Sequence, residues 1–457
     1  MATIPSTSWR SIGPMPGSRP VPDRTTPVSE RDEPHRLAHR SGPPSLWWLG
    51  WALLRLFGIL ALLHGIFPYE HAFSSSSDLY SYAQWSHDLW SGLLPYHDFA
   101  LVYPPGVIVF LGLPPVSTGV YIAEFLSVAL VADALIFRAL YRSGRSLGAV
   151  LWMIAPTALG PIFWARLDIF VAAALVAAIL CIERRRYAWA GILLAGATLV
   201  KLWPAVLIVL VLRAIPRRSW RRFLLAATGT LVVAVLPLMA LGGGAGLWHS
   251  LRSQATRGVE YESVFALPLY ALQTAGHFVP IVFGLSVNFA GPAADHVATV
   301  SDAVFVCALV FCLWRALTGR SPGADAAGWL LLLATAIVLT SKVLSPQYLV
   351  WVSAAVALVV DRASHGIRLA VVTVLLLVAT QVQFPLEFYQ MVLGTDLGLP
   401  LSALHAIVVV FFAAIAYRSV TLVPAEAGPA PTMRPARELE GDLAPVTVPM
   451  ADPRPVA

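Results

Sequence analysis

Long, continuous apolar runs separated by short arginine-rich segments make up most of the chain between about residues 46 and 418. The runs lack the alternation of apolar and polar positions that marks a half-buried strand, and many approach the ~20 residues with which a helix crosses a bilayer. A helix satisfies its own backbone hydrogen bonds, as any segment in lipid must. The pattern therefore predicts an all-α polytopic membrane protein.

Arginine clusters between the runs predict how the runs are oriented. Cytoplasmic loops carry most of the Lys and Arg residues of membrane proteins, and clusters at 138–145 and 183–186 alternate with arginine-poor connections. Following them along the chain predicts about 12 transmembrane helices with both tails in the cytoplasm. The predicted organisation is a disordered tail at 1–45, a membrane domain at 46–422 with outer loops at about 68–105 and 242–297, and a second disordered tail at 423–457.

The apolar run Tyr187–Leu212 has arginines at both ends. As one helix it would place one cluster on the outer side, against the usual distribution of positive charge. As two short spans it keeps both clusters inside, and Val200–Pro204 becomes an outer turn. Pro204 favours this break because proline removes a helix hydrogen bond. We therefore prefer two spans.

Composition supports the membrane assignment and excludes other classes. The chain is 58% hydrophobic and 12% charged, whereas about a quarter of the residues in a soluble domain are charged. The net charge of +6 comes from arginines in the loops, so it does not indicate nucleic-acid binding. Cys181, Cys307 and Cys312 lie inside apolar runs and show neither a disulfide framework nor metal-ligand spacing.

The chain has two lysines, Lys201 and Lys342, and both fall at the outer ends of predicted spans. Each could reach the interface simply by snorkelling. Charged residues at membrane depth tend to be functional, and both lysines lie on the side where positive charge is avoided. A shared anionic ligand explains the pair better.

Asp78 stands in the stretch "SSSSDLYSYAQWSHDLW", before an amphipathic segment rich in tyrosine and tryptophan. Asp and Ser are favoured at helix N-termini, and Ser75 with Asp78 fits a capping box. The local pattern alone therefore favours a helix cap over a catalytic group.

Four stretches resemble the polyprenol-phosphate-mannose-dependent mannosyltransferases of glycosyltransferase family eighty-seven, which have the GT-C fold. They are "DLYSYAQWSHDLWSGLLPYHDFALVYPPG" (78–106), "GILLAGATLVKLWPAVLIVL" (191–210), "RGVEYES" (257–263) and "SKVLSPQYLVWV" (341–352). The resemblance extends over about residues 46–418. It implies a sugar donor carried on a lipid phosphate and transfer to a hydroxyl with inversion.

The resemblance also implies roles for single residues. Asp78 matches the family's catalytic aspartate, a general base for the acceptor hydroxyl. The developing charge on the leaving phosphate requires cations, for which Lys201, Lys342 and Arg257 are candidates by side and charge. No metal or other cofactor is implied. The candidates for orienting substrate are Glu260, Glu262, Tyr80 and Tyr348, although the tyrosines equally fit an aromatic belt at the membrane interface.

The function expected from the resemblance is transfer of a hexose, most simply mannose, from polyprenyl phosphate to an envelope glycolipid or lipoglycan. The site would lie on the extracytoplasmic face of the plasma membrane. Two alternatives remain: a transporter or flippase of a lipid-linked sugar, and a non-catalytic subunit of an envelope-assembly complex. The gathering of ionisable residues on one face, with no polar path through the membrane, favours an enzyme.

Overall fold

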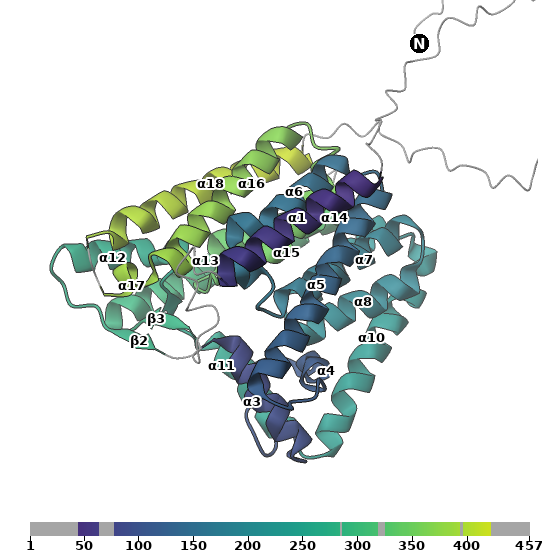
Figure 1. The fold of residues 1–457 in the computed structure, drawn as a ribbon, viewed down its shortest axis with the longest axis horizontal. Helices are drawn as coiled ribbons and strands as arrows, with labels where there is room; N and C mark the ends of the chain where they lie inside the picture. The colour runs from purple at the N-terminus through teal and green to yellow at the C-terminus, as the bar shows by residue number, and fades with distance from the viewer. Residues whose placement is uncertain (1–43, 64–76, 284–285, 319–324, 394–395, 422–457) are drawn as a thin grey trace, which may run out of the picture. The chain divides into compact units, whose positions relative to one another are not determined.

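The computed structural model describes residues 44–63, 77–283, 286–318, 325–393 and 396–421 (Figure 1). The predicted disordered tails and the first part of the predicted outer loop at 68–105 lie outside these ranges, apart from residues 44 and 45. All the described elements belong to one compact unit that begins at Ser45, one residue after the start of the first helix.

The described chain is built mainly of helices. The α-helices are α1 (Pro44–Leu63), α3 (Asp78–Trp90), α4 (Ile108–Leu111), α5 (Thr118–Arg142), α6 (Ser146–Leu159), α7 (Asp168–Glu183), α8 (Tyr187–Val200), α9 (Pro204–Leu210), α10 (Arg217–Ala240), α11 (Gly244–Ala255), α12 (Leu267–Thr274), α13 (Pro292–Thr318), α14 (Ala326–Thr340), α15 (Tyr348–Val359), α16 (Gly366–Gln381), α17 (Phe388–Val392) and α18 (Gly398–Thr421). Short 3-10 turns lie at Pro105–Val107, Pro161–Phe163, Val211–Ala214 and Val264–Ala266, and a π-helical turn, η5, at Val382–Leu386.

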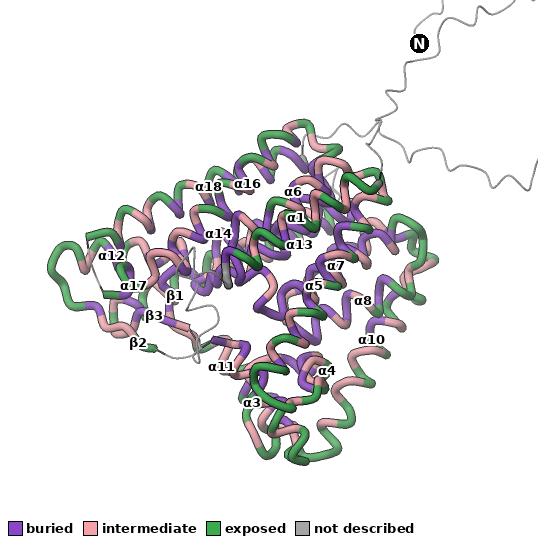
Figure 2. The backbone as a smooth tube through the Cα atoms, viewed as in Figure 1, coloured by how far each residue is buried: buried purple, intermediate pink, exposed green. Residues whose placement is uncertain are grey.

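Five helices of the described part are long and apolar enough to cross a membrane: α5, α10, α13, α18, and α16 continued through η5. Seven further apolar helices have 10–17 residues. Large apolar side chains on α10, such as Val233 and Leu236, are exposed along much of the helix (Figure 2), as expected of a surface that faces lipid. The chain is therefore a helical membrane protein, while the count of 12 spans and the GT-C fold stay predictions.

Side-chain contacts define two ends of the helix bundle. At one, which we call the Asp78 end, Arg166 binds Asp78, and Lys201 after α8 binds Asp168 at the start of α7. At the other, the Arg145 end, Arg145 pairs with Glu183. Helices α6, α7 and α8 run in turn between these two ends.

The break predicted at Pro204 is confirmed. Helix α8 ends at Val200, and Pro204 occupies the first turn of α9, where its missing N–H costs nothing. Gly191, near the start of α8, lies against the backbone of Phe223 near the start of α10, so α8 and α10 begin at the same end. The chain must therefore return from Lys201 through α9 and the 3-10 turn that follows it.

A small antiparallel sheet in the segment 242–297 departs from the predicted all-α architecture. Strands β1 (Val259–Glu260), β2 (Ile281–Phe283) and β3 (Val287–Phe289) pair in the order β1-β3-β2, with Glu260 opposite Asn288. The sheet lies beside α12 and α17 (Figure 1) and packs with them around a separate apolar cluster that includes Tyr270. Strands of two or three residues are too short to give a periodic pattern.

A buried ion pair joins α1 to the bundle. Arg55 Nε lies 2.7 Å from Asp133 Oδ2 in α5, and Arg55 also donates to the carbonyl of Met153 in α6. Asp133 accepts from the indoles of Trp152 at 2.7 Å and Trp164 at 3.2 Å. Both charges are thus paired and hydrogen-bonded, which burial of an ion pair requires.

Candidate active site

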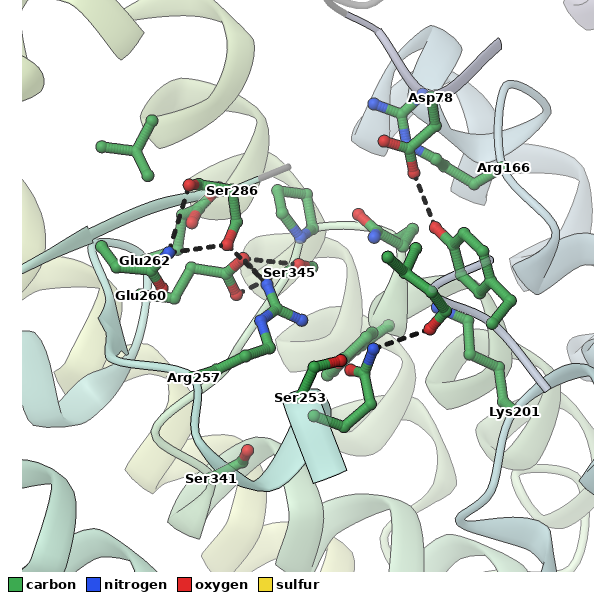
Figure 3. Close-up of a pocket in the computed structure, with 18 of the residues that line it drawn as sticks. Asp78, Arg166, Lys201, Ser253, Arg257, Glu260, Glu262, Ser286, Ser341 and Ser345 are labelled. Carbon is green, nitrogen blue, oxygen red and sulfur yellow. Dashed lines mark hydrogen bonds and ion pairs between the residues drawn. The ribbon is translucent and has the colours of Figure 1, made fainter. Parts of the chain in front are cut away.

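A cavity of about 800 Å³ opens at the Asp78 end of the bundle. Its size lies in the upper part of the range of about 300–1,000 Å³ typical of small-molecule sites. Its walls come from α3, the α6–α7 and α8–α9 connections, α11, the small sheet, the α14–α15 connection and η5 with α17. Segments far apart in the sequence therefore meet around one space (Figure 3).

Asp78 stands at the first turn of α3, and its carboxylate faces this cavity. Ser77 is the N-cap residue and makes no side-chain cap hydrogen bond, while Ser75 lies outside the described residues. Asp78 Oδ2 accepts from the hydroxyl of Tyr103 at 2.9 Å and lies 3.1 Å from Arg166 Nε. The helix start therefore carries Asp78, but side chains hold the carboxylate.

Only one of the two oxygens of Asp78 is engaged in this way. The hydroxyl of Tyr82, one turn along α3, also donates to Oδ2, at 3.3 Å. Oδ1 has no hydrogen-bond partner within the described ranges. Burial foremost, and the charge of Asp78 among further causes, raises the pKa of the Tyr82 and Tyr103 hydroxyls well above the usual value, so both stay protonated donors. The arrangement orients Asp78 and leaves one oxygen for a ligand.

Lys201 lies in the turn between α8 and α9 and lines the cavity. Its Nζ is 3.3 Å from Asp168 Oδ2 and lies over the rings of Tyr103 at 5.1 Å and Tyr348 at 5.5 Å. Asp168 also accepts from Trp351 Nε1 at 2.9 Å. The ammonium is thus fixed by a buried counter-ion and two aromatic faces.

Arg257, after α11, lies across the cavity from Asp78 (Figure 3). Its Nη2 donates to Glu260 Oε1 at 3.1 Å and to Ser286 Oγ at 2.6 Å. Nε and Nη1 have no partner in the described part of the chain, so they are free to bind an anion. The hydroxyl of Ser345 donates to Glu260, and the Glu260 amide donates to the carbonyl of Lys342 at 2.9 Å. Glu260 therefore orients Arg257.

Glu262 also lines the cavity, and 4% of the residue is exposed. Burial, and next the negative charge of Glu260, raise the pKa of its carboxyl group well above the usual value. Burial likewise raises the pKa of Glu260, against the effect of Arg257. This side of the cavity therefore favours the protonated form of Glu262.

The other predicted site residues lie in different places. Tyr348 lines the cavity, whereas Tyr80 is not among the lining residues. Lys342 does not line it either: its Nζ lies 2.7 Å from Asp302 Oδ2 in α13. The donor-binding role of Lys342 stays a prediction, and this placement does not favour it.

Two residues without a predicted role, Arg166 and Asp168, contact the predicted site residues Asp78 and Lys201. Both residues stand at the predicted outer end of a span, where charged residues are unusual. This position could have identified them as site residues. Asn288 and Ser286 carried no signal. Among the described residues, no group of three or more His, Cys, Asp or Glu side chains could hold a metal ion.

The sequence model of glycosyltransferase family 87 matches residues 101–346, more than half of the chain. The chain belongs to glycosyltransferase family 87. It is therefore a membrane glycosyltransferase, which implies a sugar donor, an acceptor and a lipid bilayer. Comparisons with curated proteins and with solved structures gave no match.

The matched segment of this glycosyltransferase contains most of the cavity's charged residues. Arg166, Lys201, Arg257, Glu260 and Glu262 all lie within it, and Asp78 precedes it. The cavity is thus the place in the molecule where family membership and converging charged groups coincide.

Proposed function

We propose that the protein transfers a hexose, mannose being the first candidate, from a polyprenyl-phosphate donor to a hydroxyl of an envelope glycolipid or lipoglycan. The observation that carries this proposal is the pairing of an oriented carboxylate, Asp78, with a cation, Arg257, on the other side of one cavity. Inverting transfer needs a base and a leaving-group site on opposite faces of the sugar.

Asp78 is the general base of the proposed reaction. The acceptor oxygen forms a bond to the anomeric carbon while the bond between that carbon and the phosphate oxygen breaks. The acceptor proton passes to Oδ1, the oxygen without a partner among the described residues. Tyr103 and Arg166 hold Oδ2 and so fix the direction from which the base meets the acceptor.

Arg257 stabilises the departing polyprenyl phosphate. Its Nη2 is bound to Glu260 and Ser286, so the guanidinium is already oriented before the donor arrives. Preorganised donors of this kind stabilise the charge that develops on a leaving group. Lys201 lies nearer the aromatic wall and adds positive potential along the cavity.

The donor also explains the orientation that we propose for the molecule. The Arg145 end is rich in arginine and is placed in the cytoplasm by the distribution of positive charge. The Asp78 end then lies at the extracytoplasmic face of the plasma membrane. Nucleotide sugars are absent there, and a lipid-linked sugar is the donor at hand.

Purified protein in lipid nanodiscs tests this function. It is supplied with a membrane lipid extract and, in separate reactions, with polyprenyl-phosphate-linked mannose, arabinose or glucose. We expect a labelled lipid product from one donor, most strongly mannose, with an inverted anomeric configuration by NMR. A product with retained configuration contradicts the mechanism, and no product from any lipid-linked donor contradicts the function.

A further inference from the structure

Buried polar atoms without a protein partner concentrate around the small sheet. Of 13 such side-chain atoms among the described residues, seven lie in the sheet and the segments packed near it. A buried polar atom is normally hydrogen-bonded, so a local concentration of unpaired atoms points to a ligand. The residues that carry these atoms are Tyr261, Glu262, Tyr270, Gln273, Asn288 and Gln383.

Three of these residues, Tyr261, Glu262 and Asn288, line the cavity. Their unpaired atoms are the Tyr261 hydroxyl, Glu262 Oε2 and Asn288 Oδ1. Asn288 Oδ1 is an acceptor, whereas a protonated Glu262 carboxyl can both donate and accept, so the ligand that satisfies both residues is one that carries hydroxyl groups. Tyr261 and Glu262 directly follow β1, and Asn288 lies on β3, which pairs with β1.

This group is joined directly to the proposed phosphate site. Asn288 Nδ2 donates to Ser286 Oγ at 2.9 Å, and Arg257 Nη2 donates to the same oxygen at 2.6 Å. Figure 3 shows Glu262 and Ser286 on the Arg257 side of the cavity, away from Asp78. A group bound here is therefore adjacent to the phosphate and not to the base.

Aromatic rings complete the same part of the wall. Phe388 packs against Tyr261 with ring centroids 5.5 Å apart, and Phe384 packs against Phe388 at 5.4 Å. All three line the cavity. A sugar ring complements this wall, because its hydroxyl groups can bind the unpaired polar atoms and its apolar C–H face can pack against the aromatic rings.

We propose that Glu262 and Asn288 form a sugar subsite and make hydrogen bonds with hydroxyls of the sugar that is transferred. This inference rests on the proposed function, because the ring attached to the phosphate is the one that must lie beside Arg257. The subsite selects the donor: a sugar whose hydroxyls do not reach Glu262 and Asn288 leaves those two side chains buried and unpaired.

Deoxy-sugar donors test the subsite. Polyprenyl-phosphate-mannose and its analogues lacking the 2-, 3-, 4- or 6-hydroxyl are compared as donors for the wild type, Glu262→Ala and Asn288→Ala, because alanine leaves no polar group at either position. In the wild type, removing a hydroxyl that meets one of these residues lowers kcat/KM roughly 5- to 150-fold. The variant that lacks the side chain bound to that hydroxyl has a lower kcat/KM with the intact donor. Removing the hydroxyl from the donor then lowers its kcat/KM no further.

Glu124→Ala is the matched control. Glu124 in α5 also has a buried carboxylate oxygen without a partner among the described residues, but it does not line the cavity. Its variant should keep the wild-type order of donors. Asn288→Ala gives a second, independent reading if Glu262→Ala does not fold.

The outcomes separate the two proposals. If the wild type is active and the loss caused by removing each sugar hydroxyl is the same in Glu262→Ala and Asn288→Ala as in the wild type, the subsite alone is overturned. A wild type that transfers from no lipid-phosphate sugar overturns the proposed function, and the subsite with it.

Discussion

Lys201 is the counter-ion of the buried Asp168 carboxylate, so replacing Lys201 should destabilise the fold. Asp168 is 1% exposed, and its carboxylate has two partners, Lys201 Nζ at 3.3 Å and Trp351 Nε1 at 2.9 Å. Lys201→Met keeps an unbranched apolar stem in the turn but removes the ammonium. The Asp168 carboxylate then stays buried with the indole alone. We expect Lys201→Met to lower both the stability and the activity of the protein.

The magnitude follows from the burial of the pair. Removing one partner of a buried ion pair costs about 3–5 kcal/mol, and the Lys201 side chain is 15% exposed, so solvent screens the pair little. At roughly 2–4 °C per kcal/mol, as for domains of 150–250 residues, the melting temperature should fall by roughly 6–20 °C.

A double variant separates the two roles of Lys201. In Lys201→Met with Asp168→Asn no buried charge is left, and Trp351 can still donate to the new amide oxygen. We expect this variant to recover most of the melting temperature, measured by thermal unfolding in detergent. If Lys201 also stabilises the leaving phosphate, kcat/KM stays about 100-fold low in the double variant.

Two results would refute this reasoning. A Lys201→Met protein that melts within about 1 °C of the wild type shows that the pair does not stabilise the fold. A double variant with wild-type kcat/KM shows that Lys201 is a counter-ion for Asp168 and nothing more.

Two further predictions concern stability. Arg55→Ala leaves the Asp133 carboxylate buried without its counter-ion and should cost about 3–5 kcal/mol. Arg55→Met with Asp133→Asn should cost less, because no buried charge remains and the amide oxygen can still accept from Trp152. Equal melting temperatures for Arg55→Ala and the double variant would contradict this. The raised pKa of Glu262 means that its contribution to stability is full below the unfolded-state pKa of about 4.3 and is lost as pH rises through the folded-state pKa. As pH rises from 4, the melting temperature of Glu262→Gln should therefore fall less than that of the wild type. An equal fall in both proteins would contradict this prediction.

Features encoded within a short stretch were predictable from the sequence. The break before Pro204 follows from the proline and from the arginines on both sides of one run, and the structure has it. A helix near Asp78 follows from the amphipathic pattern, although its N-cap is Ser77 and not the Ser75 of the predicted capping box. In both cases the deciding residues lie within a few turns of the feature.

Features that depend on distant parts of the chain were not predictable. Arg166 meets Asp78 from the α6–α7 connection, and no local pattern links the two. Lys342 pairs with Asp302, 40 positions away in the sequence, although its predicted outer position resembled that of Lys201. Apolar runs predict how deep in the membrane a residue lies. The side chains that surround it at that depth depend on how the helices pack.

The most direct test of the account is the turnover of Asp78→Asn beside Asp88→Asn. Asp88 lies on the same helix and its side chain contacts Gln84 at the surface, so it controls for loss of a carboxylate from α3. At a temperature where both variants are folded, the account predicts that Asp78→Asn binds the lipid-phosphate donor but loses about 100- to 10,000-fold in kcat, while Asp88→Asn keeps wild-type turnover. Near-normal kcat in a folded Asp78→Asn protein would show that Asp78 is not the base.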